Sequence, residues 1–245
     1  MKVFIAGVSA LKKYPSELSN CKYILESFYS IKEWQIPFIK KCEMFLLDSG
    51  AFTFMNSQKR NVDFNEYLTR YINFINKYDI KYFFELDVDS IVGYEKVKQL
   101  RKRLENETGK KCIPVWHKSR GKEEYLKMCE EYDYVAIGGI VTKEITKDQY
   151  PFFTWFLNEA HKRNCKVHGL GFTNITNLPK YHFDSVDSTA WLYGNMSGSV
   201  YKFDANNGIM NTTKAPKGKQ LISKAVALNN FNEWVRFQKY ARIRL

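Results

Sequence analysis

Short apolar runs alternate along the chain with longer stretches in which apolar residues recur at helical spacing. The short runs predict strands at residues 2–6, 44–47, 82–87, 112–116, 134–137, 166–169 and 185–186. The longer stretches predict helices at residues 63–77, 94–108, 122–131 and 149–164. Strands and helices that alternate at this spacing are typical of βαβ units, in which the strands form a parallel sheet.

The number of predicted strands favours a barrel. Seven strands, with an eighth candidate at residues 199–203, predict an α/β fold with a (β/α)8 TIM-like barrel as a single domain over residues 1–245. An open doubly wound sheet is the alternative, but no Gly-x-Gly-x-x-Gly turn follows the first strand. The last segment, residues 219–243, predicts a terminal amphipathic helix that packs on the barrel.

Polar residues and glycines gather where the predicted strands end. Active groups of a parallel barrel lie at the carboxyl ends of its strands. The candidates at these ends are Asp48, Asp87, Asp89, His117, Gly138, Gly139, His168, Gly169 and Asp187. A single carboxylate in such a place is usually a helix cap. Several of them together are costly to bury without a function, so the set favours an active site.

These residue types suit chemistry on a nucleoside. Two carboxylates can act as nucleophile and acid/base at the anomeric carbon of a sugar. A third carboxylate can accept the two adjacent N–H donors of guanine, because it is an acceptor with two oxygens. Gly138 and Gly139 permit close approach of the backbone, and Phe52 can stack on a base.

Charge and composition narrow the partners. The net charge of +12 and the pI of about 9.3 favour a polyanion, although they also fit a generally basic protein. Five scattered cysteines and the absence of a long apolar segment predict a cytoplasmic location without membrane contact. The apolar run at the N-terminus is short and interrupted by glycine, so it predicts a strand better than a secretory signal.

Six short motifs resemble the tRNA-guanine transglycosylase family, and within it the phage and bacterial DNA 7-deazaguanine transglycosylases. The motifs are DSGAF (48–52), ELDVDS (85–90), VWHK (115–118), AIGGI (136–140), HGLGF (168–172) with FDSVDST (183–189), and GNMSGSVY (194–201). Each motif is weak alone, but their order and spacing agree with the family from roughly residue 48 to residue 201.

The resemblance implies catalytic roles for the carboxylates. Asp187 would be the nucleophile that displaces guanine and forms a covalent glycosyl-enzyme. Asp48 would be the general acid/base that handles the protons of the departing and incoming bases. Asp87 would bind the guanine edge, with Asp89 as the alternative because the strand register is open.

The resemblance also implies a base-binding set. Phe52 and His168 would sandwich the base, with Gly169 beside them. His117 would replace a glutamine of the family. The backbones of Gly138 and Gly139 would donate hydrogen bonds.

Together these roles imply replacement of guanine in DNA by a 7-deazaguanine, such as the 7-cyano form, without a cofactor. The tRNA enzymes of the family carry a zinc site with three cysteines, but no cysteine follows Cys165 here, so we expect no metal and favour DNA over tRNA. The DNA would be single-stranded or base-flipped. A tRNA-guanine transglycosylase, a non-catalytic subunit of a transglycosylase complex and a glycoside hydrolase stay open, as do a partner protein or a homodimer and a phage-infected bacterium as the setting.

Overall fold

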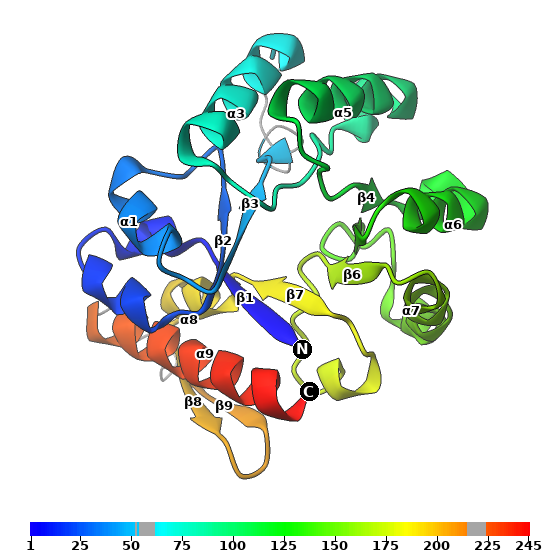
Figure 1. Ribbon diagram of the computed structural model, residues 1–245. Coiled ribbons are helices and arrows are strands. Elements are labelled where there is room, and N and C mark those ends of the chain that lie inside the picture. Colours follow the sequence, from blue (N-terminus) through cyan, green and yellow to red (C-terminus); the bar gives the residue numbers. More distant parts are fainter. Residues whose placement is uncertain (52, 54–61, 215–223) are drawn as a thin grey trace.

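The computed structural model describes residues 1–51, 53, 62–214 and 224–245. Its centre is a parallel sheet with the strand order β3-β2-β1-β7-β6-β5-β4 (Figure 1). The strands are β1 (Lys2–Ala6), β2 (Tyr23–Ser27), β3 (Met44–Asp48), β4 (Val115–Trp116), β5 (Tyr134–Ile137), β6 (Lys166–Gly169) and β7 (Ser185–Ser188).

The sheet is strongly curled. Isolated parallel bridges pair Leu47 with Phe83 and Phe84 with Ile113, so residues 83 and 84 lie between the edge strand β3 and the residues that lead into β4. The Tyr71 hydroxyl also donates to the carbonyl oxygens of Leu47 and Phe84, at 3.1 and 3.0 Å. The result is a half-barrel of seven strands that is compatible with a TIM-like fold.

Helices surround the sheet (Figure 1). The α-helices are α1 (Ile36–Ile39), α3 (Phe64–Tyr78), α4 (Asp89–Val92), α5 (Tyr94–Thr108), α6 (Gly121–Glu131), α7 (Phe153–Lys162), α8 (Ala190–Ser197) and α9 (Lys224–Arg244). Short 3-10 helices lie at η1 (Val8–Leu11), η2 (Pro15–Asn20), η3 (Glu33–Gln35), η4 (Lys118–Arg120), η5 (Lys147–Phe152) and η6 (Leu178–Lys180). Among the residues that the structure describes, no helix is both long and apolar enough to cross a bilayer.

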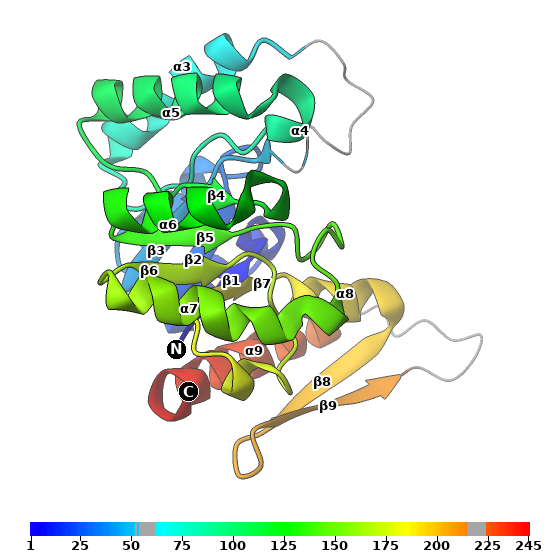
Figure 2. The same ribbon diagram turned by 90° about the vertical axis from the view of Figure 1, so that its right-hand side faces the viewer.

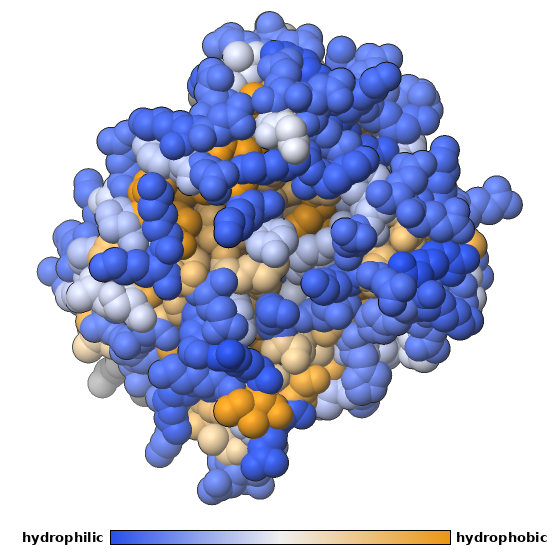
Figure 3. All heavy atoms as spheres, viewed as in Figure 1, coloured by the Kyte–Doolittle hydropathy of each residue, from blue (hydrophilic) through white to orange (hydrophobic). Residues whose placement is uncertain are grey.

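Both faces of the sheet are buried. One face forms an inner cluster of Phe4, Ala6, Tyr23, Leu25, Leu46, Phe84, Ile113, Val115 and Ala136. Neighbours in the same strands, such as Val3, Ile5 and Ile24, point the other way and pack beneath the helices. Strands buried on both faces read as continuous apolar runs, and this explains why most of them are visible in the sequence. By contrast, hydrophilic side chains cover much of the outer surface in Figure 3.

Three strand predictions need correction. Residues 23–27 form β2, which the sequence pattern did not reveal. Residues 82–87 make only the isolated bridges at Phe83 and Phe84. The predicted eighth strand, residues 199–203, lies in β8 (Ser199–Asp204), which pairs antiparallel with β9 (Ile209–Lys214) outside the main sheet (Figure 2).

Helix α9 closes one side of the molecule beside β1, α8 and β8 (Figures 1 and 2). Phe231, Trp234 and Val235 are buried on the face of this helix that packs against its neighbours, whereas Tyr240 is only partly buried. The buried Gln238 joins this helix to the sheet. Its Nε2 donates to the carbonyl oxygens of Val3 and Tyr23, each at 2.8 Å, and its Oε1 accepts from the Lys22 amide at 2.8 Å.

Candidate active site

A cavity of about 520 Å³ lies at the carboxyl ends of the strands. Six of the predicted site residues line it: Asp48, Asp87, His117, Gly138, Gly139 and Asp187. Asp89, His168 and Gly169 do not line it, and Phe52 lies outside the described residues. The cavity therefore brings together three of the predicted aspartates, Asp48, Asp87 and Asp187, which are far apart in the chain.

Asp48 ends β3 and is followed by a tight turn. Its Oδ2 accepts from the Gly50 amide at 2.9 Å. Gly50 has a φ of +84°, and a Cβ there would lie 2.9 Å from Ser27 Oγ and from Tyr29 Cβ, so the turn requires glycine. The pKa of Asp48 is raised to about 6, mainly by burial and further by the negative charges of Asp187 and Asp87. The hydrogen bonds from Gly50 and Ser27 lower the pKa, but by less than these effects raise it. A carboxyl group with this pKa can both give and take a proton near neutral pH.

Asp187, in β7, is held through one oxygen. Its Oδ1 accepts from the Gly171 amide at 2.7 Å and lies 3.2 Å from His168 Nε2. Among the described residues, no hydrogen bond is recorded to Oδ2, which leaves that oxygen for a ligand. Gly171 has a φ of +67°, and this conformation suits glycine.

A buried hydrogen-bonded chain continues behind Asp187. His168 Nδ1 lies 2.6 Å from Ser185 Oγ, and Ser185 Oγ is hydrogen-bonded to the Tyr134 hydroxyl. Since an ionised carboxylate only accepts, the chain is satisfied when Tyr134, Ser185 and His168 each donate in the direction of Asp187. The chain therefore fixes the orientation of the Asp187 carboxylate from the inner side of the sheet.

This position corrects the predicted role of His168. The ring is fully buried, and its neighbours are the rings of Phe4 and Phe84, with centroids at 6.0 and 5.3 Å. It cannot stack on a base in the cavity, because it lies in the inner core behind Asp187. Gly169 is also buried outside the lining, where a Cβ would lie 3.1 Å from Phe172 and Phe183. The glycine of this motif that reaches the cavity and the acid is Gly171.

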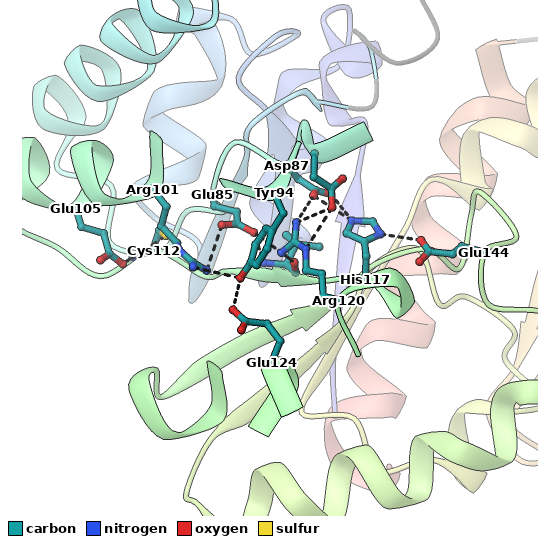
Figure 4. Close-up of polar contacts among 12 residues, drawn as sticks. Glu85, Asp87, Tyr94, Arg101, Glu105, Cys112, His117, Arg120, Glu124 and Glu144 are labelled. Carbon is teal, nitrogen blue, oxygen red and sulfur yellow. Dashed lines mark hydrogen bonds and ion pairs between the residues drawn. The ribbon is translucent and has the colours of Figure 1, made fainter. Parts of the chain in front are cut away.

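The third carboxylate, Asp87, belongs to a polar network with His117 (Figure 4). His117 Nε2 lies 3.0 and 2.9 Å from the two oxygens of Asp87, and its Nδ1 lies 2.9 Å from Glu144 Oε2. Burial lowers the pKa of His117, but the hydrogen bonds with Asp87 and Glu144 outweigh it and raise the pKa to about 9. His117 is therefore a cation at neutral pH, held between two carboxylates.

Arg120 links the acidic residues of the stretch 85–89 (Figure 4). It contacts Glu85 at 3.1 Å, Asp87 at 3.5 Å and Asp89 at 3.0 Å, and its guanidinium carbon lies 4.1 Å from the centroid of the Tyr94 ring. All three acids therefore face Arg120. Asp89 is bound there, away from the cavity, so only Asp87 of the pair can meet a ligand.

The same network bears on metal binding. Asp87, Asp89 and His117 have potential ligand atoms within 4.8 Å of one another. However, the Arg120 guanidinium and the protonated His117 already supply positive charge to these carboxylates. A cation bound by this set would have to displace the Arg120 guanidinium and the proton of His117, so the donor set fits a metal ion poorly.

The glycine pair after β5 has two different roles. The Gly138 amide donates to the Trp116 carbonyl at 2.9 Å, so it is not the free donor that the sequence predicted. A Cβ at Gly138 would lie 2.8 Å from His117 Cε1, and this explains the need for glycine. No described residue accepts from the Gly139 amide, so Gly139 is the member of the pair that can donate to a ligand.

Sequence reasoning missed several residues of this site. Arg120 follows His117 by three positions, and Gly171 is the second glycine of the HGLG motif. Both residues therefore lie close in sequence to predicted site residues and could have been included on that basis. Glu144 lies in a loop without a pattern, and Glu26 and Ser27, which also line the cavity, belong to the strand that was not predicted.

Comparisons with known proteins leave the function open. No family model and no curated protein matches the chain. One similar structure is an enolase protein from the environmental genome shotgun sequencing of the Sargasso Sea, with 9% identity and a TM-score of 0.43 over 78% of this chain and 55% of that chain. Another is the carboxyl transferase domain of Rhizobium etli pyruvate carboxylase with 3-bromopyruvate, with 11% identity and a TM-score of 0.49 over 98% and 48%. The chain spans about half the length of each protein, and neither similarity assigns a function.

Proposed function

We propose that the protein exchanges a guanine base in DNA for a 7-deazaguanine through a covalent Asp187 intermediate. The observation that carries the proposal is the pairing of two carboxylates in one cavity with different environments. Asp48 has its pKa raised to about 6, and Asp187 is oriented by Gly171 and His168 with one oxygen left for a ligand. Carboxylates whose environments differ in this way are suited to separate acid/base and nucleophilic roles.

The reaction has two displacements at the anomeric carbon. In the first, Asp187 Oδ2 attacks C1′ of the target nucleotide, the bond from C1′ to the guanine nitrogen N9 breaks, and protonated Asp48 gives its proton to the departing base. In the second, the incoming 7-deazaguanine gives its N9 proton to Asp48 and attacks C1′, which expels Asp187. The proton count is unchanged over the cycle, so no cofactor is consumed.

Base recognition falls to the opposite wall of the cavity. The Asp87 carboxylate, held by His117 and Arg120, keeps lone pairs that can accept from the N–H edge of guanine. The Gly139 amide is the candidate donor to the base carbonyl. For the fold, the proposal includes residues 83 and 84 as the eighth member of a closed (β/α)8 barrel, because their bridges link the edge at β3 with the residues before β4.

The deciding experiment follows the covalent intermediate. The protein is incubated with 7-cyano-7-deazaguanine and with either single-stranded DNA or tRNA, and the nucleosides are measured by mass spectrometry. We expect the modified nucleoside in DNA, and a denaturation-stable protein–DNA adduct that Asp187→Asn abolishes. Asp133→Asn is the matched control, because this exposed aspartate directly precedes β5, at the end of the strand opposite to the cavity. This variant should keep both the modified nucleoside and the adduct.

Three results would overturn the proposal. Base exchange that survives in Asp187→Asn would remove the proposed nucleophile. Modification of tRNA alone would move the activity to the other polymer, while hydrolysis of an aryl glycoside without any base exchange would point to a glycoside hydrolase.

A further inference from the structure

A second hollow, of about 230 Å³, lies between α6, η5 and α7 on the outer side of β4. Its walls are the apolar side chains of Trp116, Ile145, Phe152, Phe153 and Phe156. The Trp116 indole N–H already donates to the Gly121 carbonyl at 2.8 Å. The walls therefore suit a flat apolar ligand rather than one that needs many hydrogen bonds.

One wall of this hollow is exposed to solvent. Phe152 is 60% exposed, whereas Trp116 and Phe153 are 3% and 2% exposed. The Phe152 ring thus contributes little to the core and stands at the mouth of an apolar hollow. An aromatic ring in that position can stack on a nucleobase, since every base has an aromatic face.

The mouth of the hollow is positively charged. Lys118 and Lys122 line it and are both exposed, and neither forms an ion pair with a carboxylate in the described part of the chain. Lys122 Nζ lies 4.9 Å from the centroid of the Trp155 ring, which keeps its ammonium beside the aromatic group. The apolar hollow thus suits the base of one nucleotide, and the two ammonium groups beside it suit the phosphate of the same nucleotide.

The hollow lies next to the candidate active site. Along β4 and beyond it, Val115 and His117 line the active-site cavity, whereas Trp116 and Lys118 line the second hollow. Glu144, which contacts His117, accepts from the Ser119 amide at 3.1 Å, and the next residue, Ile145, forms a wall of the hollow. The His117–Glu144 pair is therefore part of the partition between the two spaces.

We propose that this hollow binds a second nucleotide of the substrate strand, with its base stacked on Phe152 and its phosphate beside Lys118 and Lys122. The proposal rests on the proposed function for the nature of the polymer, which is single-stranded DNA. It adds a binding site for a base near the target base, separate from the cavity in which exchange takes place.

The first test measures the affinity for a fluorescein-labelled single-stranded oligodeoxynucleotide with one guanine, by fluorescence anisotropy. Phe152→Ala should weaken binding about fivefold or more, as expected for the loss of one base–aromatic stack. Ile243→Ala removes another exposed apolar side chain, 78% exposed on α9, and should leave the affinity unchanged. Lys122→Ala should weaken binding and reduce its salt dependence, whereas Lys127→Ala, an exposed lysine of the same helix, should not.

The second test removes single bases from the oligonucleotide. With wild-type protein, one abasic position near the guanine should weaken binding, and Phe152→Ala should remove that penalty because the stack is already absent. Equal affinity of wild type and Phe152→Ala, or an abasic penalty that Phe152→Ala leaves intact, would overturn the second site.

Failure of the proposed function would look different. Phe152→Ala should keep the rate of base exchange at saturating oligonucleotide, because the exposed ring does not line the active-site cavity. If wild-type protein binds with the Phe152-dependent abasic penalty but exchanges no base, the binding site stands and the transglycosylase assignment fails.

Discussion

At the scale of single residues, Asp48 is placed where its charge is unfavourable. Its folded-state pKa of about 6 exceeds the ordinary value of 3.8, so the folded protein binds this proton more tightly than the unfolded chain does. The resulting stability is present below about pH 4 and is lost as the pH rises through 6. We therefore predict that Asp48→Asn, which stays neutral, stabilises the protein more at pH 8 than at pH 4.5, by about 1–2 kcal/mol.

Urea unfolding of both proteins at the two pH values measures this difference. Asp133→Asn is the control, because this aspartate is exposed and its replacement should shift stability by less than about 0.5 kcal/mol at either pH. A gain from Asp48→Asn that is equal at pH 4.5 and pH 8 would show that ionisation of Asp48 does not oppose folding.

The sequence alone was sufficient to predict part of the candidate active site. Asp48, Asp187 and His117 line the cavity because each lies at or next to the carboxyl end of a strand, and Asp87 lines it shortly after the bridges at Phe83 and Phe84. His168 lies on the expected inner face but too deep in the core to reach the cavity, since a strand pattern gives the alternation of faces but not the depth of a side chain. Glu144 reaches His117 from a loop, and contacts of that kind depend on the tertiary fold rather than on a local pattern.

At the scale of elements, α9 is attached to the sheet by a polar residue. Gln238 satisfies backbone groups of both β1 and β2, at Val3 and Tyr23. Because the side chain is fully buried, Gln238→Ala would leave several of these groups without partners. We predict a loss of about 3 kcal/mol in the free energy of unfolding, measured by urea denaturation at neutral pH.

The neighbouring residue supplies the control for this element. Lys239 is exposed on the same helix, so Lys239→Ala should change stability by less than about 0.5 kcal/mol. A loss below about 1 kcal/mol for Gln238→Ala would mean that water or a shift of α9 replaces the hydrogen bonds.

Elements differ in how well the sequence predicted them. The helix at residues 94–108 coincides with α5, because the sequence has a clear helical period there. Strand β2, with the sequence YILES, was missed because a polar glutamate interrupts its short apolar run. Residues 199–203 were correctly recognised as extended, but their partner is β9, and a single strand pattern does not identify its partner.

At the scale of the whole molecule, the charge distribution favours different places for the base and for the phosphates of a bound DNA strand. The chain carries a net charge of +12, yet the active-site cavity is lined by three aspartates. Phosphates are disfavoured in such a cavity, whereas a base with N–H donors can enter it. The phosphates of a bound strand should therefore contact lysines outside the cavity, as Lys118 and Lys122 are placed to do.

This separation predicts a strong effect of salt on binding. If several phosphates are contacted, the affinity for single-stranded DNA should fall by about tenfold or more between 50 and 200 mM salt, because bound counterions are released. Fluorescence anisotropy titrations across this range measure the slope. A methylphosphonate oligonucleotide of the same sequence has an uncharged backbone, so its binding should be nearly independent of salt. Equal slopes for the two oligonucleotides would show that the positive charge of the protein does not act on the DNA backbone, and the preference for a polyanion would then lose its physical basis.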